Sequence, residues 1–91
     1  MPVVRVEVSG AVQGVGFRWF TREAARRHGL AGWVRNREDG SVEIAASGSS
    51  ESIQRFLEEV RRGPSGAYVE ELRHLPTDLL NSLEHPFSIV R

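Results

Sequence analysis

The stretch GAVQGVGFRWF, residues 10–20, combines small residues and an arginine in an order that suits the binding of an anion. Gly14 and Gly16 can adopt backbone conformations that are closed to other residues, and neither carries a Cβ that would obstruct a ligand. Such a loop, placed before a helix, can turn several backbone N–H groups toward an oxyanion. The same glycines also suit an ordinary turn between a strand and a helix, so both interpretations stay open on the loop alone.

Arg18 follows this loop and lies in the first turn of the predicted helix. A cation at that place opposes the helix dipole, at a cost of roughly 0.3–1 kcal/mol at exposed sites. The placement is favourable where an anion shares the space, because a guanidinium group can bind two phosphate oxygens while the loop amides bind the others. A solvated surface side chain is the alternative for a single arginine.

The composition limits the class of protein. A chain of 91 residues, 40% of them hydrophobic, predicts a single domain over residues 1–91. No apolar run approaches the ~20 residues of a membrane span, and the first residues alternate in polarity, so neither a membrane segment nor a secretory signal is expected. Cysteine is absent, which excludes disulfides and thiolate catalysis and fits a cytoplasmic location.

The charge pattern argues against several partners and cofactors. Twelve basic residues balance twelve acidic ones, so the general basic surplus of a nucleic-acid-binding protein is missing. No lysine occurs, which excludes a nucleotide-binding P-loop and a Schiff-base lysine. His28, His74 and His85 lack the spacing of metal ligands, so no metal site and no cofactor are expected.

Hydrophobic periodicity predicts four main strands and two helices. Val4, Val6 and Val8 alternate with polar residues, and the other predicted strands cover residues 30–36, 42–46 and 67–75, the last with a bulge or a shifted register. The first helix is predicted from Phe17 or Arg18 to His28 after a loop over residues 10–16, with Phe20 anchoring it to the core. The second helix is predicted to bury one face, formed by Ile53, Phe56, Leu57 and Val60. Ser49 or Ser50 can cap its start, and Gly63 and Pro64 mark its end.

The order of these elements is strand, helix, strand, strand, helix, strand. With right-handed crossovers this order predicts an α+β protein of the ferredoxin-like class, a split β-α-β sandwich whose antiparallel sheet carries both helices on one face. After Pro76, residues 77–85 could form a short helical turn, and Phe87 and Ile89 suggest a last edge strand. Because this fold has many functions, the function must be argued from the site.

Two segments of the sequence resemble a known family. The segment VSGAVQGVGFR, residues 8–18, resembles the first signature of the acylphosphatase family, a phosphate-binding loop of the form G-x-V-Q-G-V-x-F-R. The segment GWVRNREDGSVEIAASG, residues 32–48, resembles the second signature, in which an asparagine lies three residues after an aromatic residue and glycine, valine and a final glycine follow. Both signatures occur in the expected order on the expected fold.

This resemblance implies a hydrolase that cleaves acyl phosphates without a metal ion. By position, Arg18 would be the catalytic arginine that binds the phosphate, and Asn36 would be the second catalytic residue and hold the attacking water. The phosphoryl group, inorganic phosphate or another anion would be bound by Arg18 together with the backbone amides of Val12, Gln13, Gly14, Val15, Gly16 and Phe17. Since no histidine or carboxylate lies in the core of either signature, we expect the phosphate itself to accept the proton of the water.

Two alternatives and one open question accompany this hypothesis. An RNA-binding module shares the fold, but its aromatic residues belong on the third strand, where SVEIAAS has none. A catalytically silent, anion-sensing copy of the domain is the other alternative. No coiled-coil pattern indicates more than a monomer, and no motif describes a pocket for the acyl group, so a broad range of acyl groups is expected.

Overall fold

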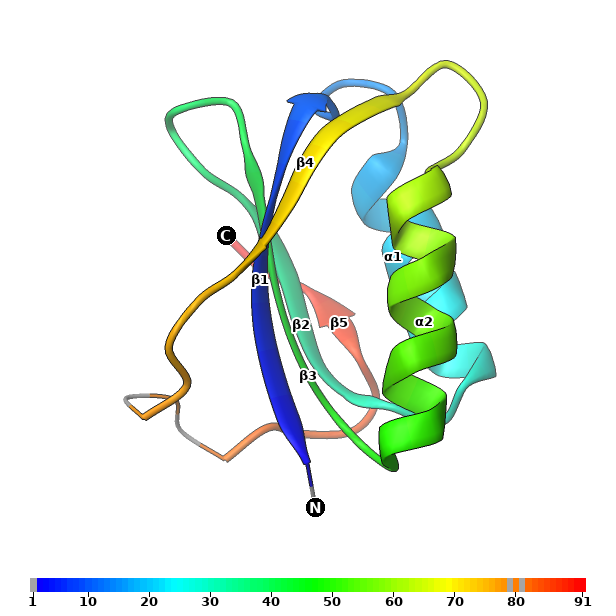
Figure 1. The fold of residues 1–91 in the computed structure, drawn as a ribbon, viewed down its shortest axis with the longest axis vertical. Helices are drawn as coiled ribbons and strands as arrows, with labels where there is room; N and C mark the ends of the chain where they lie inside the picture. The colour runs from blue at the N-terminus through cyan, green and yellow to red at the C-terminus, as the bar shows by residue number, and fades with distance from the viewer. Residues whose placement is uncertain (1, 79, 81) are drawn as a thin grey trace.

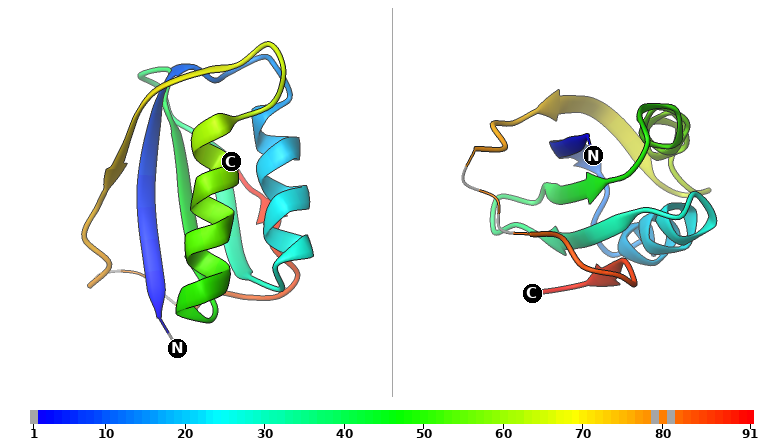
Figure 2. Two further views of the ribbon diagram at one scale, coloured as in Figure 1. Left: turned by 45° about the vertical axis from the view of Figure 1, so that its right-hand side comes forward. Right: turned by 90° about the horizontal axis from the view of Figure 1, so that it is seen from below.

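The computed structural model describes residues 2–78, 80 and 82–91. In these residues one sheet carries both helices on the same face (Figures 1 and 2), which confirms the predicted class and layer arrangement. The elements in chain order are β1 (Val3–Ala11), α1 (Phe17–Arg27), β2 (Ala31–Asn36), β3 (Val42–Ser47), α2 (Ser50–Arg62), β4 (Tyr68–His74) and β5 (Ser88–Ile89).

The sheet has the strand order β4-β1-β3-β2-β5. The first four strands are antiparallel, whereas β5 runs parallel to β2, with Trp33 opposite Ser88 and Val34 opposite Ile89. The prediction of an edge strand near Ile89 is therefore confirmed, but the prediction of a wholly antiparallel sheet is wrong. Because β4 and β5 lie at opposite edges, the chain crosses the width of the sheet between them, and a crossover of this kind permits a parallel pairing.

The core lies between the sheet and the helices. The alternating valines of β1 and the predicted apolar face of α2 are buried, except that Leu57 is only partly buried. In α1 the predicted anchor was Phe20, but Phe20 is half-buried and Phe17 is 1% exposed. Phe17, Thr21 and Ala24 are spaced at i, i+4 and i+7, so the stripe that faces the sheet begins at the first residue of the helix.

The ends of both helices follow the sequence signals. The side chain of Ser49 accepts a hydrogen bond of 3.1 Å from the backbone N–H of Ser52, and α2 ends before Gly63, which has a φ of 67°. Helix α1 ends at Arg27 with His28 as its cap, and Gly29 follows. Helix α1 begins at Phe17, directly before Arg18, with Gly16 as its N-cap.

The predicted irregularity of the fourth strand is a bulge between β1 and β4. Ser9 pairs with Glu71 and Gly10 pairs with Val69, so Glu70 is the extra residue. Gly10 has a φ of 125°, and a Cβ there would lie 2.2 Å from the carbonyl oxygen of Tyr68. Because Gly10 and Ala11 belong to β1, the loop begins at residue 12 and is shorter than the predicted range of 10–16.

The segment after β4 differs from the prediction in its described part. The predicted helical turn over residues 77–85 is not formed by the residues described there, of which Asp78 lies in a simple turn. Leu79 and Asn81, which also belong to that predicted turn, lie outside the described residues. Proline at position 76 removes a backbone donor, and the short stretch that follows carries no long apolar face that would stabilise a helix.

Candidate active site at the start of helix α1

The loop between β1 and α1 leaves its backbone donors open. Gly14 and Gly16 have φ values of 78° and 76°, and a Cβ on either glycine would meet no atom within 4 Å. Gly16 caps α1 and provides no side-chain hydrogen bond. Within the described part of the chain, the N–H groups of residues 12–19 donate no hydrogen bond to another residue. The loop thus presents a row of free donors beside open space, as an anion site requires.

Arg18 carries its charge into the same region. The side chain is half-buried, and among the described residues it forms no ion pair and no hydrogen bond. The first turn of α1 contains no acidic residue that could balance the charge. An arginine in the first turn without a protein partner is favourable when an external anion neutralises both the guanidinium group and the helix terminus.

Asn36, the last residue of β2, faces this arginine across a cavity of about 180 Å³. Its Oδ1 atom is buried and has no hydrogen-bond partner among the described residues. A buried acceptor of this kind is costly unless a ligand or a water molecule completes it. Thr21 Oγ1 is also buried without a partner, but Thr21 lies on the core-facing stripe of α1 and does not line the cavity.

The cavity collects most of the predicted site residues. Its lining consists of Val12, Gly14, Gly16, Phe17, Arg18, Trp19, Asn36 and Ile89. Val15 does not line the cavity and packs in part against the core. The structure therefore brings Arg18, Asn36 and the loop glycines together, although they come from two distant parts of the sequence.

Only the backbone amide of Gln13 was predicted to take part in the site, but its side chain also forms hydrogen bonds beside it. Its side-chain amide donates hydrogen bonds of 2.9 Å to the carbonyl oxygens of Arg37 and Ser41 in the turn between β2 and β3. The loop is thereby fixed to the strand end that carries Asn36. These two hydrogen bonds connect the loop before α1 with the turn that follows Asn36.

Two lining residues were missed at the level of the sequence. Trp19 is 57% exposed and follows Arg18 directly, so its place in the motif was the available signal. Ile89 is 36% exposed and reaches the cavity because β5 lies beside β2. No local pattern indicates this contact, since it depends on the pairing of two segments that are far apart in the chain.

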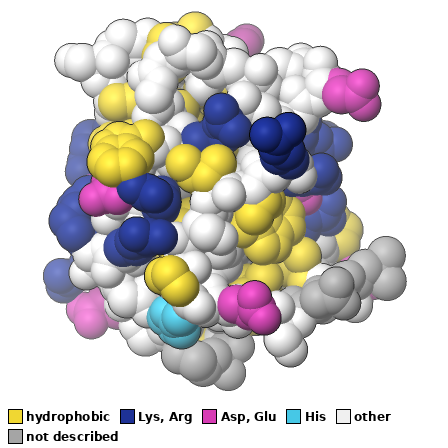
Figure 3. Space-filling view, turned by 180° about the vertical axis from the view of Figure 1, so that it is seen from behind, with side chains coloured by type: hydrophobic (Ala, Val, Ile, Leu, Met, Phe, Trp, Pro, Cys, Tyr) yellow, Lys and Arg dark blue, Asp and Glu magenta, His cyan; other side chains and the backbone are white. Residues whose placement is uncertain are grey.

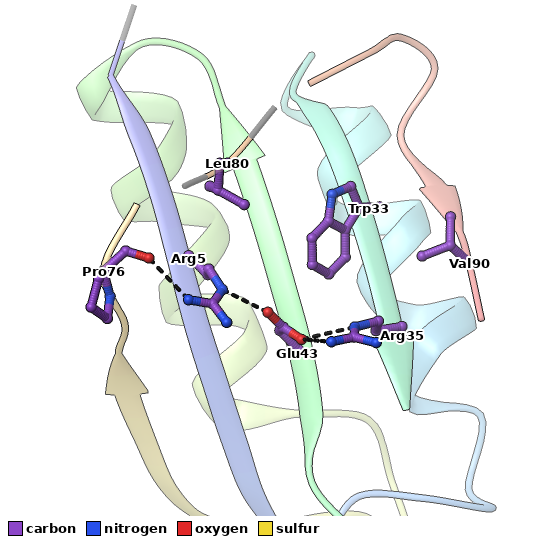
Figure 4. Close-up of a pocket in the computed structure, with 7 residues that line it drawn as sticks. All are labelled: Arg5, Trp33, Arg35, Glu43, Pro76, Leu80 and Val90. Atoms are coloured by element: carbon purple, nitrogen blue, oxygen red, sulfur yellow. Dashed lines mark hydrogen bonds and ion pairs between the residues drawn. The ribbon is translucent and has the colours of Figure 1, made fainter. Parts of the chain in front are cut away.

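A larger cavity of about 290 Å³ lies on the other face of the sheet (Figure 4). There Glu43, 1% exposed, accepts hydrogen bonds of 2.6 Å from Arg5 Nε and 2.8 Å from Arg35 Nε. Burial raises the pKa of Glu43, but the hydrogen bonds from Arg5 and Arg35 outweigh it and hold the pKa below its ordinary value of 4.5. Trp33 is half-buried and lines this cavity. The polar groups of this cluster already have partners within the protein.

Other chemistry lies away from the candidate site. His28 Nε2 lies 2.5 Å from a carboxylate oxygen of Glu59, beyond the far end of α1. Within residues 2–78, 80 and 82–91, no three histidine, aspartate or glutamate side chains gather in a way that could hold a metal ion. In the same residues, neither helix is long and apolar enough to cross a membrane.

The fold and this site define a small α+β sandwich. A cavity at the start of its first helix is lined by Arg18 and Asn36, whose polar groups lack partners among the described residues. The family model for acylphosphatase matches residues 4–89. An acylphosphatase from Gloeobacter violaceus is 49% identical over 86 residues, which cover 94% of this chain and 90% of that protein. Together these matches place the chain in the acylphosphatase family, and it is an enzyme of this type.

Solved structures agree with this assignment. The crystal structure of acylphosphatase from Bacillus subtilis has a TM-score of 0.91 and 43% identity, and the match covers 100% of both chains. The structure of an acylphosphatase from Coxiella burnetii has a TM-score of 0.84 and 33% identity over 97% of this chain and 90% of that one. The similarity extends over the whole architecture, including the sheet that positions Asn36.

Proposed function

We propose that this protein hydrolyses the carboxyl-phosphate bond of acyl phosphates to a carboxylate and inorganic phosphate. Membership of the acylphosphatase family supports this type of reaction. The observation that carries the assignment of residues is the cavity in which Arg18 and Asn36 Oδ1 both lack a partner among the described residues.

The phosphoryl group is bound by the backbone N–H groups of residues 12–17 and by the guanidinium group of Arg18. These donors have no acceptor elsewhere in the described chain, so they are free to bind phosphoryl oxygens. Negative charge on those oxygens is stabilised by fixed dipoles and by a cation in a partly buried site, where such interactions are stronger than in water. Since the side chain of Gln13 ties the loop to the turn between β2 and β3, the loop needs less reorganisation on binding than an unrestrained loop would.

Asn36 orients the attacking water. Its Oδ1 accepts a hydrogen bond from the water, whose oxygen attacks phosphorus in line with the departing carboxylate. The new P–O bond forms as the bond between phosphorus and the acyl oxygen breaks, and the carboxylate leaves with the electron pair. An amide oxygen cannot take the proton, so a phosphoryl oxygen accepts it and the products are carboxylate and protonated phosphate.

The proton route predicts that no protein base is required. His28 is engaged with Glu59 beyond the end of α1 and does not line the cavity. Replacement of His28 by alanine is therefore expected to leave the shape of the profile of kcat against pH unchanged. An ionisation that disappears in this variant would contradict the substrate-assisted route.

The activity itself is tested with benzoyl phosphate, by release of inorganic phosphate in the presence of EDTA. Wild-type protein is expected to turn over in EDTA as fast as without it, because the proposed site uses only side chains and backbone amides. Protein that binds phosphate but does not turn over benzoyl phosphate would be an anion-sensing copy of the domain, and the proposed reaction would be wrong.

A further inference from the structure

The mouth of the candidate site is bordered by exposed hydrophobic side chains. Trp19 and Ile89 are among the large hydrophobic residues that the described chain leaves exposed, at 57% and 36%. Both line the same cavity as Arg18 and Asn36, and they come from α1 and β5. Seen from behind, the molecule carries several patches of hydrophobic side chains on its surface, some of them beside arginines (Figure 3).

The ring of Trp19 is supported by a neighbouring cation. The guanidinium carbon of Arg22 lies 4.1 Å from the ring centroid, and Arg22 also pairs with Glu23 at 3.2 Å. A cation over one face of the indole holds the ring in place and leaves its other face or its edge free for contact. This contact favours one orientation of the ring at the cavity.

The lining of the cavity combines two kinds of surface. The free amides and Arg18 suit the phosphoryl group, whereas Trp19 and Ile89 offer mainly apolar surface. A substrate whose phosphoryl group binds the amides and Arg18 can place its acyl group against Trp19 and Ile89, because these side chains line the same cavity. Burial of apolar surface against them stabilises the complex by roughly 25 cal/mol per Å².

We propose that Trp19 and Ile89 form an acyl-group subsite, so that the preferred substrates are acyl phosphates with a planar apolar acyl group, such as an aromatic one. This inference rests on the proposed function of the same site. It differs from the expectation from the sequence, which was a broad range of acyl groups, because it predicts a preference among them.

The subsite is tested by comparing kcat/KM for benzoyl phosphate and acetyl phosphate in wild-type protein and in Trp19→Ala. The ratio between the two substrates is compared across variants, because the intrinsic reactivity of each substrate then cancels. Trp19→Ala is expected to lower kcat/KM for benzoyl phosphate about 3- to 10-fold and to change the value for acetyl phosphate less than about 2-fold. Trp19→Phe is expected to recover most of the preference, because a planar ring is restored.

Tyr68→Ala is the matched control. Tyr68 is an aromatic residue that is 66% exposed on β4, and it lines none of the cavities described above. Its removal is expected to leave the ratio unchanged. Equal losses for both substrates in Trp19→Ala, or no loss for either, would overturn the subsite.

A binding measurement separates failure of the subsite from failure of the proposed reaction. Phenacylphosphonate and acetonylphosphonate replace the bridging oxygen by carbon and cannot be hydrolysed at that bond. Wild-type protein is expected to bind the phenacyl compound more tightly by calorimetry, and Trp19→Ala is expected to lose most of that difference. Absence of turnover with a retained phenacyl preference would refute the reaction alone, whereas equal binding of both phosphonates would refute the subsite.

Discussion

Arg35 and Asn36 are neighbours in β2, yet they belong to polar clusters with opposite properties. Arg35 lies on the face of the sheet without helices, where it and Arg5 share the carboxylate of Glu43. Asn36 lines the cavity at the start of α1, where its Oδ1 and the Arg18 side chain lack partners in the described chain. The cluster around Glu43 is satisfied within the protein, whereas the groups at the start of α1 are the ones we propose to bind a ligand.

The energetics of the two clusters support this distinction. A buried carboxylate that accepts charge-assisted hydrogen bonds on both oxygens has replaced its lost hydration with protein groups. A buried amide oxygen without a partner costs about 1–3 kcal/mol, and a free cation in the first helical turn adds to that cost. The site at α1 therefore carries a cost in stability that a bound phosphoryl group and a water molecule would remove.

The largest expected effect is the loss of activity in Arg18→Gln. Removal of the only cation proposed to contact the phosphoryl oxygens is expected to lower kcat/KM for benzoyl phosphate by at least about 10³-fold. Because Arg18 has no partner in the described chain and opposes the helix dipole, the free energy of unfolding is expected to stay the same or to rise by up to about 1 kcal/mol. Both values are measured on the same preparation, by phosphate release and urea denaturation.

Arg55→Gln is the control for this change. Arg55 is an exposed arginine on α2 that pairs with Glu51, far from the cavity in sequence and absent from its lining. Its replacement is expected to leave kcat/KM unaltered. An Arg18→Gln protein that retains activity, or that loses it only because it unfolds, would contradict the proposed role.

A smaller loss is expected for Asn36→Ala, about 10²- to 10³-fold in kcat, because the phosphoryl group is still bound but the water is no longer oriented. The variant also removes a buried acceptor without a partner, so its stability is expected to match or exceed that of the wild type. Steady-state kinetics and urea denaturation measure the two effects. A rise in KM with unchanged kcat would assign Asn36 to binding instead.

The reverse pattern is expected for Glu43→Gln in the partnered cluster. Loss of the charge leaves Arg5 and Arg35 without their shared carboxylate, and the free energy of unfolding is expected to fall by about 1–3 kcal/mol. The activity is expected to stay within about 2-fold of the wild type. Glu58→Gln, an exposed glutamate on α2, is the control. A large loss of activity without a loss of stability would show that Glu43 serves the reaction rather than the fold.

The smallest expected effect is a fall in the free energy of unfolding at acidic pH. Because the pKa of Glu43 is lowered in the folded protein, its contribution to stability is fully present above its ordinary pKa of 4.5 and is lost as the pH falls below it. The stability difference between wild type and Glu43→Gln is therefore expected to shrink as the pH falls from 4.5 through the lowered pKa of the folded protein. If the difference in stability between wild type and Glu43→Gln does not change with pH, the charge of Glu43 is not the source of the stabilisation.

Much of the site could be predicted because its signals are local. Gly14, Gly16 and Arg18 lie within five consecutive positions, and the start of a helix places their backbone and side chain around one space. In α1 the buried aromatic residue is Phe17 and not the predicted Phe20. The sequence does not distinguish them, because both are phenylalanines and only packing against the sheet decides which one is buried.

The remaining features depend on contacts between distant segments. Ile89 reaches the cavity through the parallel pairing of β5 with β2, and no pattern near residue 89 fixes the direction of so short a strand. The hydrogen bonds from Gln13 to Arg37 and Ser41 likewise arise from tertiary proximity. The partial exposure of Trp33 also depends on the tertiary arrangement, because both helices cover the opposite face of the sheet (Figure 4).

We propose that Arg18, Asn36 and the loop amides, which lack partners in the described chain, bind a phosphoryl group. Titration of ¹⁵N-labelled protein with inorganic phosphate, followed by NMR, tests this binding. Saturable shifts are expected in the backbone amides of residues 12–18 and in the side-chain amide of Asn36, and they are expected to vanish in Arg18→Gln. Shifts that centre on Arg5 and Arg35, or amides of residues 12–18 that do not respond to phosphate, would contradict the account.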